Sequence, residues 1–262
     1  MGFKRSFKNK TAAVERLYKK LHLDNDIELL HKYRINLRKL YAYSEVYGKQ
    51  VDKKSSAELS GVLKKLLKPT SALRDLDLFL VEIEQMGCRP KIQERLHKIF
   101  TSIREKRFRS FLNDEEYKKN IKKLNSMLKK SKLFIYKIED IDKYAIISKM
   151  GRKIYDKFHK IDYNTSLEEL HDLRIEFKKF RYALEAYEKY FQKDKRVFDG
   201  MYDLKEVQES FGIIQDNNKR LQFIGKVENK FTKKEQRELK AYFELKIRDA
   251  KRELFTLISK VG

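Results

Sequence analysis

The sequence predicts an all-α protein, and three observations support this fold class. The chain has 262 residues but only two prolines and nine glycines, whereas folds with many strands need frequent turns. Apolar residues recur at intervals of three and four along most of the chain, which is the spacing of one helix face. A set of motifs also occurs twice in the same order. We therefore expect two four-helix bundle repeats, related by a pseudo-twofold and joined by a linking helix.

The first repeat, residues 1–112, is expected to contain four helices. Their apolar periodicity places them at residues 6–23, 26–47, 55–87 and 89–112. Pro69 should bend the third helix, because its ring clashes with the preceding turn and it has no N–H to donate. Gly48 and Gly87 suit helix ends.

A connecting segment, residues 113–137, is expected to hold a linking helix at about 114–130. The second repeat, residues 138–262, should then place helices at residues 139–161, 166–191, 195–228 and 232–260. Ser166 or Thr165 should cap the second of these, with Glu168 or Glu169 reaching back to the cap. The first should turn a core stripe inward, in which Gly151 permits close helix contact. The stripe consists of Tyr144, Ser148, Gly151, Tyr155 and Phe158.

Three pairs of matching segments indicate an internal duplication. "HKYRINLRKLY" begins at His31, and "HDLRIEFKKFRYALE" begins at His171. Upstream, "LYKKLH" (17–22) matches "IYDKFH" (154–159), and downstream "LRDLD" (73–77) matches "IQDNN" (214–218). One match would mean little in a chain so rich in Lys and Arg, but three in the same order indicate two related repeats.

The duplicated motif sets a histidine and two cations on one helix face. At about 100° per residue, His31, Arg34 and Arg38 fall within roughly 60° of one another. The opposite side is apolar and carries Tyr33, Leu37 and Leu40. An isoleucine repeats among the cations, as Ile35 and Ile175, although a fully solvated face has little reason to keep one. We therefore expect the two cationic faces to line a partly enclosed groove between the repeats.

The charge of the chain indicates a polyanionic partner. Its 62 Lys and Arg residues against 39 Asp and Glu residues give a net charge of +23. Such an excess opposes compaction through self-repulsion, so its retention favours a nucleic acid, an anionic membrane surface or a phosphate polymer as partner. No run of about 18 apolar residues and no signal-peptide region is present, so we expect a soluble, cytoplasmic protein. Of the three candidate partners, we do not expect a membrane.

Together these motifs resemble the CHAD family, the conserved-histidine α-helical domain. The resemblance covers essentially the whole chain and rests on H-x-x-R-x-x-x-R-K from His31, R-D-L-D from Arg74, and H-x-x-R-x-x-x-K-K-x-R-Y-x-x-E from His171. Membership implies a single CHAD domain over residues 1–262, with a basic central surface that binds inorganic polyphosphate and an association with polyphosphate granules.

The resemblance also implies which residues bind polyphosphate. The family's basic positions carry over to His31, Arg34, Arg38, Lys39, Arg74, His171, Arg174, Lys178, Lys179 and Arg181. Two departures predict unequal half-sites: Tyr41 stands where a further Arg is common, and Gln215 occupies the repeat position of Arg74. His31 and His171 either contact the ligand or orient a neighbouring helix. Asp75 and Asp216 are expected to fix nearby Arg or Lys side chains, with a catalytic acid pair as the alternative.

Two rival functions remain beside polyphosphate binding. A sequence-independent nucleic-acid binder would also be basic and could act through phosphate contacts alone, but no helix-turn-helix, zinc or RNA-binding signature is present. An enzyme would need a metal site or an activated nucleophile. The chain has one cysteine, Cys88, no H-x-x-x-H pair with supporting carboxylates, and no E-x-E-x-K signature like that of the triphosphate-tunnel enzymes fused to some CHAD proteins. We therefore expect a binding domain without enzymatic activity, metal or cofactor.

Overall fold

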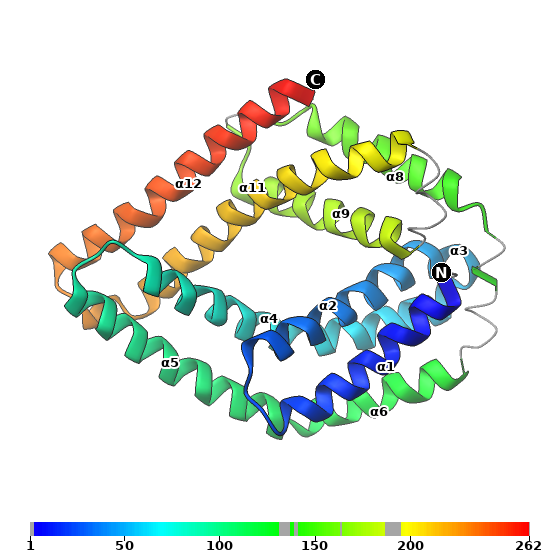
Figure 1. The fold of residues 1–262 in the computed structure, drawn as a ribbon, viewed down its shortest axis with the longest axis horizontal. Coiled ribbons are helices and arrows are strands. Elements are labelled where there is room, and N and C mark those ends of the chain that lie inside the picture. Colours follow the sequence, from blue (N-terminus) through cyan, green and yellow to red (C-terminus); the bar gives the residue numbers. More distant parts are fainter. Residues whose placement is uncertain (1–2, 131–136, 139–140, 163, 187–194, 262) are drawn as a thin grey trace. The chain divides into compact units, whose positions relative to one another are not determined.

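The described part of the chain is built from helices, with no strand among its residues (Figure 1). The computed structural model describes residues 3–130, 137–138, 141–162, 164–186 and 195–261. The chain forms two compact units: unit 1 comprises residues 1–86, 93–146 and 182–190, and unit 2 comprises residues 87–92, 147–181 and 191–262. Within these described ranges, no helix combines the length and the apolar character needed to cross a bilayer.

The helices agree closely with the predicted ones. Unit 1 is formed mainly by α1 (Phe3–Leu21), α2 (Ile27–Tyr43), the π-helix η1 (Ser44–Gly48), α3 (Lys49–Val51), α4 (Lys53–Gln85), α5 (Pro90–Asn113) and α6 (Glu115–Lys130). Unit 2 is formed mainly by α8 (Lys143–Phe158), α9 (Leu167–Ala186), α11 (Lys195–Lys226), the short 3-10 helix η3 (Glu228–Lys230) and α12 (Lys233–Val261). Residues 139–140 and 187–191 of the predicted helices lie outside the described residues. The pseudo-twofold and the repeat boundaries stay predictions.

The core of unit 1 is rich in tyrosine, and it includes the helix that was predicted as a linker. Tyr117 of α6 is buried, and its hydroxyl lies 2.7 Å from that of Tyr33 on α2 and donates to the Leu66 carbonyl of α4 at 3.2 Å. Burial raises the pKa of both phenols, so they stay neutral and remain available as donors. These bonds fasten α6 to α2 and α4, so α6 is part of the packed unit.

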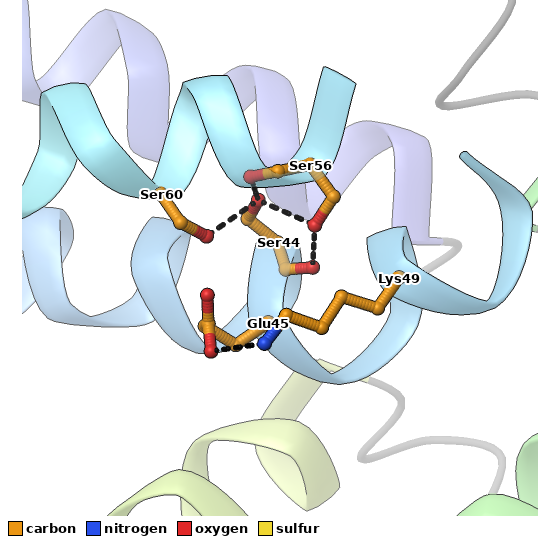
Figure 2. A network of polar contacts seen from close by, with 5 residues as sticks. All are labelled: Ser44, Glu45, Lys49, Ser56 and Ser60. Carbon is orange, nitrogen blue, oxygen red and sulfur yellow. Dashed lines mark hydrogen bonds and ion pairs between the residues drawn. The ribbon is translucent and has the colours of Figure 1, made fainter. Parts of the chain in front are cut away.

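Small polar side chains join the end of α2 to α4 (Figure 2). The Ser44 hydroxyl donates to the Ser56 carbonyl at 3.0 Å, the Ser56 hydroxyl donates to the Ser44 carbonyl at 2.6 Å, and the Ser60 hydroxyl donates to that of Ser44 at 3.1 Å. All three serines are buried.

The prediction that Gly48 ends a helix is wrong, because the π-helix η1 carries the helical backbone past it into α3. Gly87, in contrast, does follow the end of α4.

The predicted cap of α9 is confirmed. The Ser166 hydroxyl accepts from the Glu169 N–H at 3.2 Å, and the Glu169 carboxylate accepts from the Ser166 N–H at 3.0 Å. This reciprocal pair is a capping box, which satisfies two donors that a helix start otherwise leaves unbonded.

The predicted core stripe of α8 is wrong at two positions. Tyr144 and Tyr155 are 45% and 55% exposed, whereas Ile147 and Ile154 are buried and Phe158 is buried as predicted. The inward face is therefore rotated by about one residue from the predicted one, because the aliphatic side chains occupy the core and the tyrosines keep their hydroxyls in water. Gly151 does lie in a contact: a Cβ built there would be 3.5 Å from the Phe180 ring of α9.

Candidate functional site

The apolar side of α2 is buried as predicted, and this fixes the direction of its cationic side. Tyr33, Leu37 and Leu40 are all fully buried. His31 and Arg38 lie on the other side of the helix and are half-buried, whereas Arg34 between them is only 4% exposed. The cationic face of α2 is therefore not a solvated surface at its centre.

Arg34 is held by two hydroxyl groups of α4. Its Nη1 atom donates to Thr70 Oγ1 and to Ser71 Oγ, both at 3.0 Å. These hydroxyls in turn donate to the Leu67 carbonyl, at 3.0 Å and 2.8 Å. Both follow Pro69, which lies inside α4 and has no N–H of its own. Because each hydroxyl uses its proton on the backbone, its lone pairs remain for Arg34.

Arg38 on α2 and Arg74 on α4 complete a concentration of positive charge around Arg34 and His31. Burial, with the charges of Arg38 and Arg74, lowers the pKa of Arg34 to about 9, although Asp75 opposes the shift. Burial and the charge of Arg74 also lower the pKa of His31, with smaller effects of Arg34 and Arg38 and an opposing one of Glu28. We name His31, Arg34, Arg38 and Arg74 the first cationic cluster.

Lys39 takes part in a different arrangement. Its Nζ atom lies 2.6 Å from the Glu185 carboxylate, and both side chains are largely covered. Glu185 belongs to residues 182–186 of α9, which are part of unit 1. Burial lowers the pKa of Lys10 on α1. The charge of Lys39 lowers it further and that of Glu185 raises it, which shows that Lys10 lies near this pair. Lys39 thus fastens α2 to the end of α9, and the buried bond from the Tyr47 hydroxyl to the Ala183 carbonyl at 2.7 Å does the same.

In unit 2, Arg174 occupies the motif position that corresponds to Arg34. Its Nη2 atom lies 3.7 Å from Asp216 of α11, so the prediction that Asp216 fixes a nearby cation is confirmed. The same atom would be 3.8 Å from a Cβ built on Gly212. The side chain of Arg174 is 14% exposed, so it is more open to solvent than Arg34.

Three further cations of unit 2 lie on or face the same part of α9. Burial is the largest effect that lowers the pKa of His171. The charges of Arg174, Lys219 and Lys178 lower this pKa further, whereas the charge of Asp172 raises it. Its Nδ1 atom is buried, and within the described part of the chain no hydrogen-bond partner reaches it. We name His171, Arg174, Lys178 and Lys219 the second cationic cluster. Lys179 and Arg181 also lie on α9, where both are half-buried.

Lys219 was not identified from the sequence. The alignment of the two repeats sets Leu78 at its position, so the duplicated motif gave no signal for it. The available signal was helical spacing, because Lys219 comes three residues after Asp216 and four after Gln215.

Each cluster can bind an anion with several negative charges. Arg offers forked donors for phosphate or carboxylate oxygens, and Lys offers a point charge. The side chains stand on helices and several are held by internal bonds, so less side-chain freedom is lost when a ligand binds. Neither cluster contains a nucleophile paired with a base, and in the described ranges no three His, Cys, Asp or Glu residues gather as they would around a metal ion.

Comparison with known proteins identifies a family and several solved structures of similar fold, including the two that follow. The family model described as "CHAD domain" matches residues 7–224. The crystal structure of the CHAD domain from the plant Ricinus communis is 15% identical, with a TM-score of 0.74, and the match covers 99% of this chain and 92% of that one. PptA from Streptomyces chartreusis is 10% identical, with a TM-score of 0.69 and coverage of 96% and 95%. At these identities the structures show a shared fold. None of the curated proteins matches this chain significantly.

Proposed function

This chain belongs to the CHAD family, and on that premise we propose that it binds inorganic polyphosphate through its two cationic clusters. The observation that carries the proposal is the second occurrence of the arrangement. Each unit presents a histidine and an arginine one turn apart on one helix, with a further cation contributed by a second helix. Unit 1 uses α2 and α4, and unit 2 uses α9 and α11. A chain that needed only a positive surface would have no reason to build the same cluster twice.

The chemistry of polyphosphate suits these clusters. Polyphosphate carries about one negative charge per phosphate along a flexible backbone and has no base edges or stacking faces, so only cations and hydrogen-bond donors can recognise it. Cations one helical turn apart are about 6 Å from each other, which allows successive contacts along such a chain. Tyr33 and Phe111 of unit 1 are buried, so these two aromatic side chains are not available to stack on the bases of a nucleic acid.

We propose a binding role without catalysis, in which the protein attaches to polyphosphate granules or organises them. The carboxylates near the clusters support this role. Asp216 is paired with Arg174, and the charge of Asp75 acts on Arg34, so both are engaged with cations and are poorly suited to proton transfer. Addition of Mg²⁺ or Mn²⁺ to the polyphosphate complex should therefore release no phosphate, and steady release would contradict the proposal.

The proposal is tested by comparing the affinities of the protein for three polyanions. Fluorescently labelled long-chain polyphosphate, single-stranded RNA and duplex DNA of matched total charge are titrated with the protein at about 0.15 M salt, where exposed charges are largely screened. We expect the tightest binding for polyphosphate. Equal or tighter binding of RNA or DNA would favour a sequence-independent nucleic-acid binder and would overturn the proposal.

A further inference from the structure

One face of α11 lies against the cationic side of α9 within unit 2. The Nη2 atom of Arg174 lies 3.7 Å from the Asp216 carboxylate, and it would lie 3.8 Å from a Cβ built on Gly212. Lys219 continues this face, because positions separated by four and then three residues lie on one side of a helix. Lys219 is half-buried, and its charge acts on His171, one turn before Arg174 on α9. Lys219 therefore faces the same part of α9 as Arg174 and His171.

The two units differ at the residues that surround the motif arginine. In unit 1, Thr70 and Ser71 bind Arg34, but the corresponding residues of α11 are Phe211 and Gly212, which have no hydroxyl. Phe211 is instead buried in the core, with its ring 5.9 Å from that of Phe177. The two positions of α11 that correspond to Thr70 and Ser71 therefore offer no hydroxyl to Arg174.

The contribution of the second helix also differs between the units. In unit 1, the long helix α4 supplies Arg74, whose charge is the strongest of those acting on His31. Gln215 stands at the corresponding position of α11 and carries no charge. Lys219 lies one turn further along α11, where unit 1 has Leu78. Lys219 thus places a cation on the second helix of unit 2, displaced by one turn from the position that corresponds to Arg74.

From this geometry we propose that Lys219 contacts the bound polyanion and supplies the positive charge that Gln215 does not. The inference rests on the proposed polyphosphate function and adds to it a binding residue in unit 2. Half-burial strengthens the role, because a partly desolvated cation forms a stronger bond to phosphate than a fully hydrated one.

The first test compares Lys219→Ala with Lys234→Ala, each of which removes one charge from unit 2. Lys234 is an exposed residue in the first turn of α12 and serves as the matched control. We expect Lys219→Ala to weaken binding of labelled long-chain polyphosphate by about tenfold, as for the loss of one charged hydrogen bond, and Lys234→Ala to weaken it by less than about twofold. The salt dependence of log affinity should also become shallower for Lys219→Ala, since fewer ions are released on binding. Equal affinities for the two variants would overturn the inference.

The second test restores the charge at the other position. Adding Gln215→Arg to Lys219→Ala places an arginine where unit 1 has Arg74, and we expect affinity to return to within about threefold of the wild type. Failure of this double variant to recover would contradict the claim that Lys219 replaces that charge. A different result would overturn the proposed function: a wild-type protein that does not bind polyphosphate more tightly than RNA or DNA. The inference on Lys219 fails only if the wild type binds polyphosphate and the substitutions behave otherwise than stated.

Discussion

Arg34 and Arg174 hold the same position of the duplicated motif but lie in different surroundings. Arg34 is almost fully buried, with two hydroxyls on its Nη1 atom and two further cations close by. Arg174 is more exposed and is balanced by Asp216. A buried charge is costly unless it is fully compensated, and its neighbours Arg38 and Arg74 increase that cost. We therefore expect the Arg34 charge to lower the stability of unit 1, and the proposed binding of polyphosphate would explain why a charge stands there.

Replacing Arg34 by methionine should stabilise the protein and weaken binding. Methionine keeps much of the volume and removes the buried charge, and Thr70 and Ser71 can still donate to the Leu67 carbonyl. We expect the free energy of unfolding to rise by about 1 kcal/mol, the lower end of what such replacements give. Thermal unfolding followed by circular dichroism should show a higher Tm, and polyphosphate affinity should fall.

The control for this substitution is Arg16→Met, which removes the same charge from an exposed position of α1. It should change the free energy of unfolding by less than about 0.5 kcal/mol. A lower Tm for Arg34→Met than for the control would show that the two hydroxyl bonds outweigh the cost of burying the charge.

At the scale of single helices, α2 and α9 carry the same sequence of a histidine, then a cation three residues later, then another after four more. The apolar side of α2 is fully buried, so the helix can present these residues in only one direction. The second helix of each unit decides how they are held: α4 offers hydroxyls after Pro69, whereas α11 offers a carboxylate and a glycine. The two clusters therefore differ in how their central arginine is held, and the inequality of the two half-sites in ligand binding stays a prediction.

The histidines of these two helices predict how binding depends on pH. In the free protein, burial and the charges of Arg74 on α4 and Arg174 on α9 lower the pKa of His31 and His171 below the usual value of about 6.5. A bound polyanion favours the charged imidazole and raises both values. Protons are then taken up on binding, so we expect polyphosphate affinity to rise as the pH falls from about 7.5 to about 5.5.

The free protein should show the opposite trend. Since the folded-state pKa values lie below those of the unfolded chain, the unfolded state binds more protons in that range, and stability falls as the pH drops through about 6.5 and then through the folded values. The double variant His31→Gln, His171→Gln tests both statements in titrations and thermal unfolding. A wild-type affinity that stays constant over this range would assign both histidines a purely structural role.

At the scale of the whole molecule, the net charge of +23 attracts any polyanion. Such attraction acts at long range and is damped over a Debye length of about 8 Å at physiological salt. The contacts that we propose at the two clusters would be close and partly desolvated, so they should persist when salt weakens the general attraction.

Two variants with equal loss of charge separate these contributions. The first replaces Arg38, Arg74, Arg174 and Lys178 by alanine and leaves the buried Arg34 in place. The second replaces four lysines of α6 by alanine: Lys118, Lys119, Lys122 and Lys123. We expect the cluster variant to lose at least about tenfold more polyphosphate affinity than the α6 variant, because each charged hydrogen bond contributes roughly 1.5–3 kcal/mol. Circular dichroism should show that both remain helical, and equal losses would mean that only the overall charge matters.

The sequence by itself determined the helical class, nearly all of the helices and the family. Helical periodicity is a local property, so it can be read without knowing what each helix packs against. The cap of α9 is local in the same way, because Ser166 and Glu169 are three residues apart. The duplicated motif also identified the helices that carry the two clusters.

The tertiary structure decided what each charged residue does. Lys39 and Arg38 are neighbours in sequence, yet Lys39 pairs with Glu185 and Arg38 joins the first cationic cluster. The exposure of Tyr144 and Tyr155 and the position of Lys219 near His171 likewise depend on which helix lies opposite. The interaction energy and the pKa of a charged side chain depend on its burial and on partners within a few ångströms. Residues distant in sequence supply both. Spacing along one helix therefore predicts the face on which a side chain lies, and the packing of a second helix determines whether that side chain is buried, paired or available to a ligand.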